Sequence, residues 1–236
     1  MKSQYVLPFS IVIVGILIAG AVFLISRAPS GSSTGTTAAA VRPVDSTDHI
    51  FGNPDAPVKI VEYADLECPF CKDFETTMDQ VMQYYGASGK VAWVFRNFPL
   101  AQIHSKAPAE AAAAECAAAQ GGSPAFFKFI DKLYSVTPSE NGLDPAQLPI
   151  IAGDIGLNVT TFNQCTAAGT YATKVQDQYN EGIAEGFQGT PAIVIMTSDG
   201  AALTLSGAQP YASMRAAVDQ VLSSIGQSVG TSTATH

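Results

Sequence analysis

The sequence is poor in basic residues and in histidine. Its 236 residues contain 12 lysines and arginines against 20 aspartates and glutamates, which gives a formal net charge of -8. No basic stripe is visible along the chain, so nucleic-acid binding is not expected. The three histidines, His49, His104 and His236, show no paired spacing. Zinc sites usually combine close pairs of ligands, so no metal site is expected, and nothing in the sequence calls for a cofactor.

Long uncharged apolar stretches are confined to the start of the chain. Residues Tyr5–Ile25 are almost continuously apolar, with no charge until Arg27. About 20 such residues span a bilayer as a helix, so we expect residues 1–27 to be a transmembrane anchor. A cleaved signal peptide is the alternative, because Ala19–Ala21 offers small residues for cleavage. The expected location is the cell membrane, with a single pass and the rest of the chain on the extracytoplasmic side.

Composition divides the rest of the chain into three parts. Gly, Ser and Thr are frequent in residues 28–44, which predicts a flexible linker because such residues bury too little apolar surface to fold. Residues 45–226 are long enough for one domain with a substantial core. Residues 227–236 are polar and predict a disordered tail.

Apolar periodicity predicts an α/β fold for residues 45–226. Apolar, β-branched runs at 57–64 and 90–95 predict strands on either side of a helix at 69–85, which implies a parallel strand pair. Helical patterns then fill residues of about 104–187. Strand character returns at 192–205, and an amphipathic pattern predicts a last helix. We therefore expect one sheet-based domain with an inserted helical bundle.

Two of the four cysteines, Cys68 and Cys71, lie where the first predicted strand meets its helix. Pro69 suits the first helical turn, where its missing N–H costs nothing. The free N–H groups and the dipole at a helix N-terminus stabilise a thiolate, so the pKa of Cys68 should be low. A second thiol one turn away completes what disulfide exchange needs. Zinc binding lacks further ligands, and a two-residue loop makes a poor structural disulfide.

The residues around this pair resemble a known family. The segment Glu67–Phe74 after a strand, a helical insertion, and then Gly189–Ala192 before a strand resemble the DsbA-like branch of the thioredoxin superfamily. The likeness is strongest to its membrane-anchored or secreted bacterial thiol:disulfide oxidoreductases, over about Val44–Ile225. It implies a thioredoxin-like fold with an inserted α-helical domain. It also implies that Cys68 is the exposed nucleophile and Cys71 the buried resolving cysteine.

The resemblance assigns supporting roles to further residues. Pro191 matches a cis-proline that faces the disulfide and leaves the backbone of Thr190 free to pair with an extended substrate. An ordinary strand-entry proline is the alternative. Glu62 matches a buried carboxyl group that exchanges protons with Cys71. A solvent-facing position on an alternating strand is the alternative for Glu62.

The other two cysteines, Cys116 and Cys165, stand alone in predicted helices. Some members of the branch join a similar pair as a structural disulfide, which would close a loop of about 50 residues and add about 4 kcal/mol of stability. Two buried free thiols are the alternative.

Phe70 departs from the best-known oxidant of the branch, which has a histidine between its cysteines. Phenylalanine carries no charge and donates no hydrogen bond, so we expect Cys68 to be less acidic and its disulfide less oxidising than in histidine-containing relatives. For His104, a compensating position near the site and an ordinary surface position are both open.

The expected function is the introduction of disulfides into reduced extracytoplasmic proteins, with a membrane partner that reoxidises the cysteine pair. A disulfide reductase or isomerase that uses the same pair is one alternative. A non-catalytic peptide-binding or chaperone module is the other.

Overall fold

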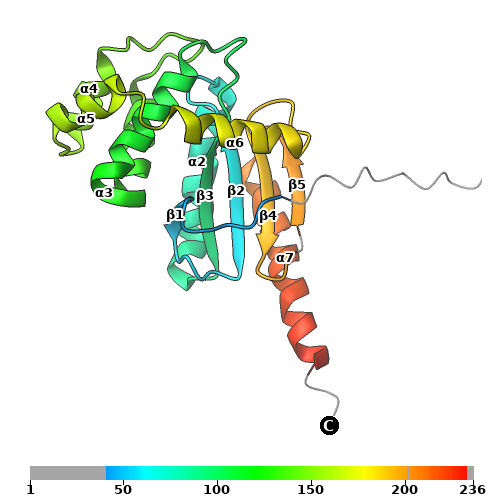
Figure 1. Cartoon of the computed structure of the whole chain (residues 1–236). Coiled ribbons are helices and arrows are strands. Elements are labelled where there is room, and N and C mark those ends of the chain that lie inside the picture. The colour runs from blue at the N-terminus through cyan, green and yellow to red at the C-terminus, as the bar shows by residue number, and fades with distance from the viewer. Residues whose placement is uncertain (1–40, 201, 233–236) are drawn as a thin grey trace, which may run out of the picture. The chain divides into compact units, whose positions relative to one another are not determined.

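The computed structural model describes residues 41–200 and 202–232 (Figure 1). The transmembrane anchor predicted for residues 1–27 and most of the predicted linker lie outside the described residues. Within the described part of the chain, no helix combines the length and the apolar character that crossing a bilayer requires.

A mixed five-stranded sheet forms the centre of the domain. Its strands, in the spatial order β1-β3-β2-β4-β5, are β1 (His49–Gly52), β3 (Val91–Asn97), β2 (Val58–Ala64), β4 (Ala192–Thr197) and β5 (Ala202–Ser206). Strands β2 and β3 are parallel, as predicted, and the other neighbouring pairs are antiparallel. Strand β2 therefore lies in the middle of the sheet, where both of its faces are covered.

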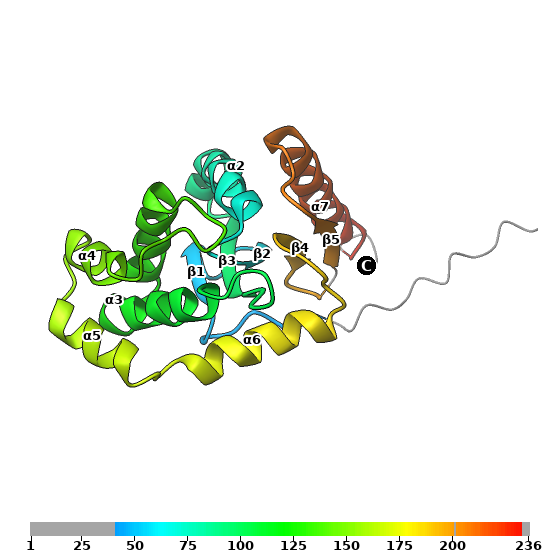
Figure 2. The same ribbon diagram turned by 90° about the horizontal axis from the view of Figure 1, so that it is seen from above.

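Helices cover both faces of the sheet and extend beyond one edge (Figures 1 and 2). Their bounds are α2 (Pro69–Tyr85), the 3-10 turn η1 (Gly86–Ser88), α3 (Ala107–Val136), α4 (Gln147–Asp154), α5 (Val159–Ala167), α6 (Ala172–Ala184) and α7 (Tyr211–Ser232). Helices α2 and α7 pack on one face of the sheet, and α6 runs across the other (Figure 2). The segment from α3 to α6 separates β3 from β4 in the chain, so the predicted helical insertion is present.

The helical insertion contains a break and a covalent link. Helix α3 is interrupted by non-helical backbone at Gly121 (φ -148°) and Gly122 (φ 64°), where two successive glycines break the helical pattern. Cys116 of α3 and Cys165 of α5 form a disulfide across a sequence separation of 49 residues. This bond ties the outer helix α5 to α3.

Both ends of the predicted domain need correction. Arg42, placed in the linker by composition, pairs with Asp48 at 2.8 Å, so ordered structure begins before residue 45. Composition does not reveal such a partner. At the other end, α7 continues to Ser232, so the predicted disordered tail 227–236 is wrong for residues 227–232. A helix that is already nucleated extends at little cost, because each added residue brings one more hydrogen bond.

Candidate active site

Cys68 lies at the junction between β2 and α2, as the sequence predicts. It is the N-cap residue of α2, with extended backbone (φ -78°, ψ 122°), and Pro69 opens the first turn. Its N–H donates to the carbonyl of Asp65 at 3.1 Å, and its own carbonyl accepts from the N–H groups of Cys71 and Lys72, each at 3.1 Å. These bonds fix the turn that brings Cys68 and Cys71 to the same end of the helix.

Both cysteines of the motif are free thiols, and both are buried. Cys71 has no exposed surface, as expected of a resolving cysteine, whereas Cys68 is only 5% exposed. The expectation of an exposed Cys68 is therefore wrong for this state. The physical reason is that a segment distant in sequence covers the sulfur, with Sγ of Cys68 3.6 Å from the carbonyl oxygen of Thr190. Phe70, by contrast, is 62% exposed beside the pair.

The two thiols differ strongly in acidity. A hydrogen bond from the Cys71 thiol lowers the pKa of Cys68 to about 6, helped by Thr190 and by the N–H groups of Cys71 and Phe70, although burial opposes this shift. Burial raises the pKa of Cys71 well above its ordinary value, and the nearby charges of Cys68 and Glu62 add to that effect. At neutral pH the pair therefore holds a thiolate at Cys68 and a protonated thiol at Cys71.

Glu62 is buried on β2 below the cysteine pair. The Trp93 indole Nε1–H donates to its Oε2 at 3.0 Å. Burial raises the pKa of Glu62 to about 8, despite the Trp93 hydrogen bond, and the Cys68 thiolate contributes to the increase. The solvent-facing alternative for Glu62 is therefore excluded. A carboxyl group with a pKa near neutrality can accept and return a proton.

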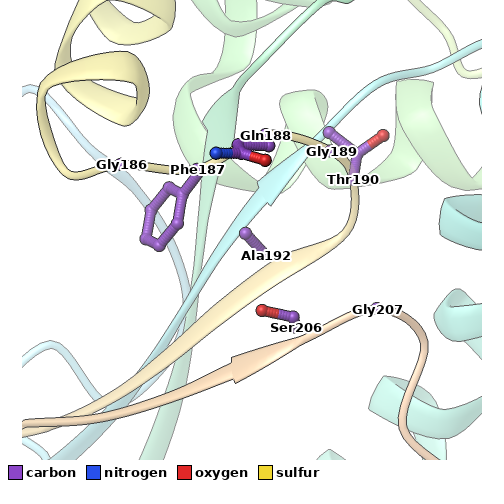
Figure 3. A pocket seen from close by; sticks show the side chains of 8 residues that line it. All are labelled: Gly186, Phe187, Gln188, Gly189, Thr190, Ala192, Ser206 and Gly207. Atoms are coloured by element: carbon purple, nitrogen blue, oxygen red, sulfur yellow. The ribbon is translucent and has the colours of Figure 1, made fainter. Parts of the chain in front are cut away.

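The Thr190–Pro191 peptide bond is cis. The Pro191 carbonyl accepts from the Gly207 N–H at 2.9 Å, which joins this loop to the segment after β5. The Thr190 side chain helps to lower the pKa of Cys68. Within the described residues its buried hydroxyl has no hydrogen-bond partner besides that sulfur. A cavity of about 330 Å³ opens along the same loop (Figure 3); its lining residues are Gly186, Phe187, Gln188, Gly189, Thr190, Ala192, Ser206 and Gly207.

The sequence did not reveal the role of Asp65. Its Oδ1 accepts from the Glu67 N–H at 2.8 Å, and its Oδ2 accepts from the Leu100 N–H at 2.7 Å and lies 2.9 Å from Nδ1 of His104. His104 is thus a buried residue linked to the cysteine turn through Asp65. An aspartate that bonds the backbone two residues further on is typical of a turn, and this local signal could have identified Asp65.

No group of three or more His, Cys, Asp or Glu side chains in residues 41–200 and 202–232 has an arrangement that could hold a metal ion. The reactive groups that the structure places at the site are the two sulfur atoms and the Glu62 carboxyl group, with the hydrogen bonds around them.

Comparison with known proteins places this fold and site in a family. A family model described as Thioredoxin matches residues 45–220. DsbA2 from Pseudomonas aeruginosa is similar, with 26% identity and a TM-score of 0.65 over 76% of this chain and 97% of that one. BdbD from Bacillus subtilis has 22% identity and a TM-score of 0.67 over 78% and 97%. The chain belongs to the thioredoxin family, and its fold is that of the DsbA-like thiol:disulfide oxidoreductases.

Curated relatives carry a different name. The Na(+)/H(+) antiporter NhaA 1 of Mycobacterium sp. (strain KMS) is 38% identical over 125 residues, which are 52% of this chain and 19% of the relative. NhaA 3 of Salinispora tropica is 33% identical over 171 residues, which are 72% of this chain and 25% of the relative. The chain thus spans about a fifth to a quarter of these relatives, and the likeness concerns one part of each.

Proposed function

We propose that this chain is a protein disulfide oxidase that introduces disulfides into reduced extracytoplasmic proteins through Cys68 and Cys71. The observation that carries the proposal is the position of Cys68 as N-cap of α2 beside Thr190, where the hydrogen bond from Cys71, helped by Thr190, lowers its pKa to about 6. A dithiol form that is stabilised as a thiolate makes the corresponding disulfide a stronger oxidant. Cys68, which is 5% exposed at the N-terminal end of α2 and lies beside Thr190, is suited to exchange with a docked chain rather than with bulk thiols.

The reaction begins with the oxidised Cys68–Cys71 pair. A substrate thiolate attacks Sγ of Cys68, the bond between the two cysteine sulfurs breaks, and Cys71 leaves as a thiolate that takes a proton. In this proposal Glu62, the buried carboxyl group that raises the pKa of Cys71, supplies that proton. A second substrate thiolate then attacks the substrate sulfur of the mixed disulfide, and Cys68 leaves as its stabilised thiolate. The substrate has lost two electrons, and the cysteine pair has gained them.

The loop at Thr190 provides the substrate-binding surface in this proposal. Its backbone lies beside Sγ of Cys68, and the adjoining cavity of about 330 Å³ is lined largely by glycine and small polar residues. An extended peptide that pairs with the Thr190 backbone, as an added strand would, presents its cysteine to Cys68. Side chains of the peptide then enter the cavity, whose lining residues Figure 3 shows.

Turnover requires an oxidant, which in our proposal is a membrane redox partner that accepts two electrons from the reduced pair. The apolar stretch at residues 1–27 would hold the domain near that partner as a single-pass anchor, with the domain on the extracytoplasmic side. Thiol alkylation in cells reports the steady state of the pair. A pair found mostly as a disulfide supports the oxidase, and a pair found mostly as a dithiol indicates a reductase or isomerase.

A direct test uses the oxidised protein and reduced, unfolded ribonuclease A as a probe substrate. Recovery of ribonuclease activity is expected. Each molecule of oxidised protein added should remove two thiols from the ribonuclease by forming one disulfide. Cys68→Ser should abolish the reaction. Faster reduction of insulin than oxidation of ribonuclease would overturn the oxidase in favour of a reductase. Full protection of the probe from aggregation by Cys68→Ser, with no oxidation by the wild type, would identify a binding module.

A further inference from the structure

Glu67, the residue before Cys68, is fully buried and held by a loop of the helical insertion. Its carbonyl accepts from the Glu140 N–H at 2.8 Å, and its Oε2 accepts from the Asn141 N–H at 2.6 Å. Glu67 is joined to the nucleophile Cys68 by a single peptide bond. A shift of the Glu67 backbone therefore shifts Cys68.

The loop that holds Glu67 has an unusual backbone. Ser139, Glu140 and Asn141 have φ values of 65°, 53° and 66°. Three successive residues other than glycine with positive φ are costly and persist only where surrounding contacts enforce them. The same loop reaches the other end of the motif, because Nζ of Lys72 donates to the Thr137 carbonyl at 2.5 Å. We call residues 137–141 the strap, since they bond to the residues on both sides of the Cys68–Cys71 motif.

A second carboxyl group, that of Glu110 on α3, meets Glu67. Both residues are buried, and among the described residues neither Oε1 of Glu67 nor Oε2 of Glu110, both buried, has a hydrogen-bond partner. The two carboxyl groups are close enough for Glu67 to raise the pKa of Glu110. Two carboxylates are both acceptors, so a bond between them requires one proton. Burial and the charge of Glu67 raise the pKa of Glu110 to about 9. The proton therefore resides on Glu110 at neutral pH, and the Asn141 N–H donates to the facing Glu67 carboxyl group.

Other charged groups lie near Glu67 and Glu110, but none of those named below takes the place of the proton between the two carboxyl groups. Asp65 lies on the Glu67 side and also raises the pKa of Glu110, whereas Lys106, just before α3, lowers it. The Lys106 ammonium group donates to the Leu143 carbonyl at 2.6 Å, and His104 is engaged with Asp65.

We propose that the proton shared by Glu67 and Glu110 locks the strap onto the cysteine turn and so positions Cys68 against Thr190. Loss of the proton leaves two adjacent buried anions, which repel each other and release Glu67 from its fixed position. Glu67 and Glu110 are positioning residues, because neither touches the reacting sulfur atoms. The effect on exchange rests on the proposed oxidoreductase function, whereas the lock itself does not.

The lock predicts a specific pH dependence of stability. A carboxyl group whose pKa is raised by folding contributes stability that is complete below its unfolded pKa and is lost as the pH rises through its folded pKa. Glu110→Gln can donate its amide N–H to Glu67 at every pH. The melting temperature of Glu110→Gln, minus that of the wild type, is therefore expected to rise by a few degrees between pH 5 and pH 9.

The matched control is Glu115→Gln, which changes another buried carboxyl group on the same helix. Glu115 is paired with cations, which lower its pKa, so this variant should show no such rise. Melting curves of Glu110→Gln and wild type that stay parallel over this range would overturn the lock.

The effect on Cys68 is measured with the reduced protein and iodoacetamide. In the wild type, alkylation of Cys68 is expected to follow its thiolate titration and then to depart from that curve near pH 9, where the lock opens. Glu110→Gln should follow the single curve throughout, and Glu67→Ala should slow ribonuclease oxidation roughly tenfold. Identical alkylation profiles for wild type and Glu110→Gln would show that the pair only stabilises the fold. If the wild type shows no oxidase activity while the melting temperatures of Glu110→Gln and wild type still diverge with pH, the proposed function is rejected and the lock is retained.

Discussion

The domain buries carboxyl groups in two regions, and their pKa values are raised in one region and lowered in the other. Beside the cysteines, burial raises the pKa values of Glu62, Glu75 and Glu110. Around Arg96 and Lys174, hydrogen bonds and neighbouring charges outweigh burial and lower the pKa values of Asp48 and Glu115. Among the residues that the structure describes, Glu62, Glu75 and Glu110 form no ion pair.

The cation-paired region joins separate parts of the fold. Arg96 of β3 is fully buried, and its Nε donates to Asp48 Oδ1 at 3.0 Å, which holds the segment before β1 against the sheet. Lys174 of α6 and His49 of β1 contact Glu115 of α3 at 2.7 and 2.8 Å. These bonds satisfy charges that folding has removed from water, so they maintain the arrangement of helices and strands.

The region beside the cysteines combines lower stability with proton chemistry. Burial of a carboxyl group without a cation reduces the stability of the fold, but it keeps the group protonated near neutral pH, so that the group can donate a proton. The two regions also have opposite pH signatures. Stability from Asp48 and Glu115 is lost as the pH falls through their lowered pKa values, whereas stability is lost near Glu62 and Glu110 as the pH rises toward about 8 and 9.

The strongest way to break the comparison is to remove the cation from the paired region. Arg96→Met leaves Asp48 as a buried charge without its main partner, and the expected loss is about 3–5 kcal/mol in the free energy of unfolding. Urea denaturation measures this loss. The double variant Arg96→Met/Asp48→Asn should recover part of it. The pKa of Cys68 should not change, because the bonds that Arg96 makes within the described residues do not involve Cys68 or Cys71. A loss below about 1 kcal/mol would mean that the pair contributes little.

The second prediction removes a proton from the unpaired region. Glu62→Gln keeps an acceptor for the Trp93 indole but has no proton to exchange with Cys71. Proton transfer to and from Cys71 should therefore be slower, and the rate of thiol–disulfide exchange should fall by about tenfold or more. Trp93 is the only tryptophan of the chain and contacts residue 62, so its fluorescence can follow the reaction in stopped flow. Glu75→Gln is the matched control, since it also removes an unpaired buried carboxyl group. An equal slowing in both variants would assign the effect to stability rather than to Glu62.

Much of the catalytic end of the fold follows from local sequence. The apolar run before Cys68 predicts β2, Pro69 marks the start of α2, and both elements begin and end close to the predicted residues. Glu62 lies an even number of residues before Cys68 on a strand that is buried on both faces, so its burial was predictable once that strand was assigned to the sheet centre.

The remaining features depend on partners that are distant in the chain. Cys68 is buried because Thr190 covers it, and no local pattern contains that contact. The strap was missed because its positive φ values fall on Ser139–Asn141, whereas the local glycine signal is Gly142. A Cβ atom at Gly142 would lie 2.7 Å from the Ser139 carbonyl oxygen, so this glycine serves close packing. The surrounding contacts, and not residue preference, set the backbone of the strap.

The smallest expected change sharpens the comparison at the cysteine pair itself. Cys68 reaches a pKa of about 6 with only neutral hydrogen-bond donors around its sulfur. Phe70→His would add a cation beside the thiolate, and because position 70 is exposed the fold should tolerate it. We expect the pKa of Cys68 to fall by about one unit and the disulfide to become more oxidising.

Thiolate absorbance in the ultraviolet gives the pKa, and equilibration with glutathione gives the redox potential. Phe70→Gln is the neutral control and should change neither value by a comparable amount. An unchanged pKa in Phe70→His would mean that the histidine points away from the sulfur or that the helix N-terminus and Thr190 already supply all the stabilisation that the thiolate can use. In that case the absence of a cation at this site would have no effect on the direction of exchange, and the potential would be set by burial of Cys71 and Glu62 instead.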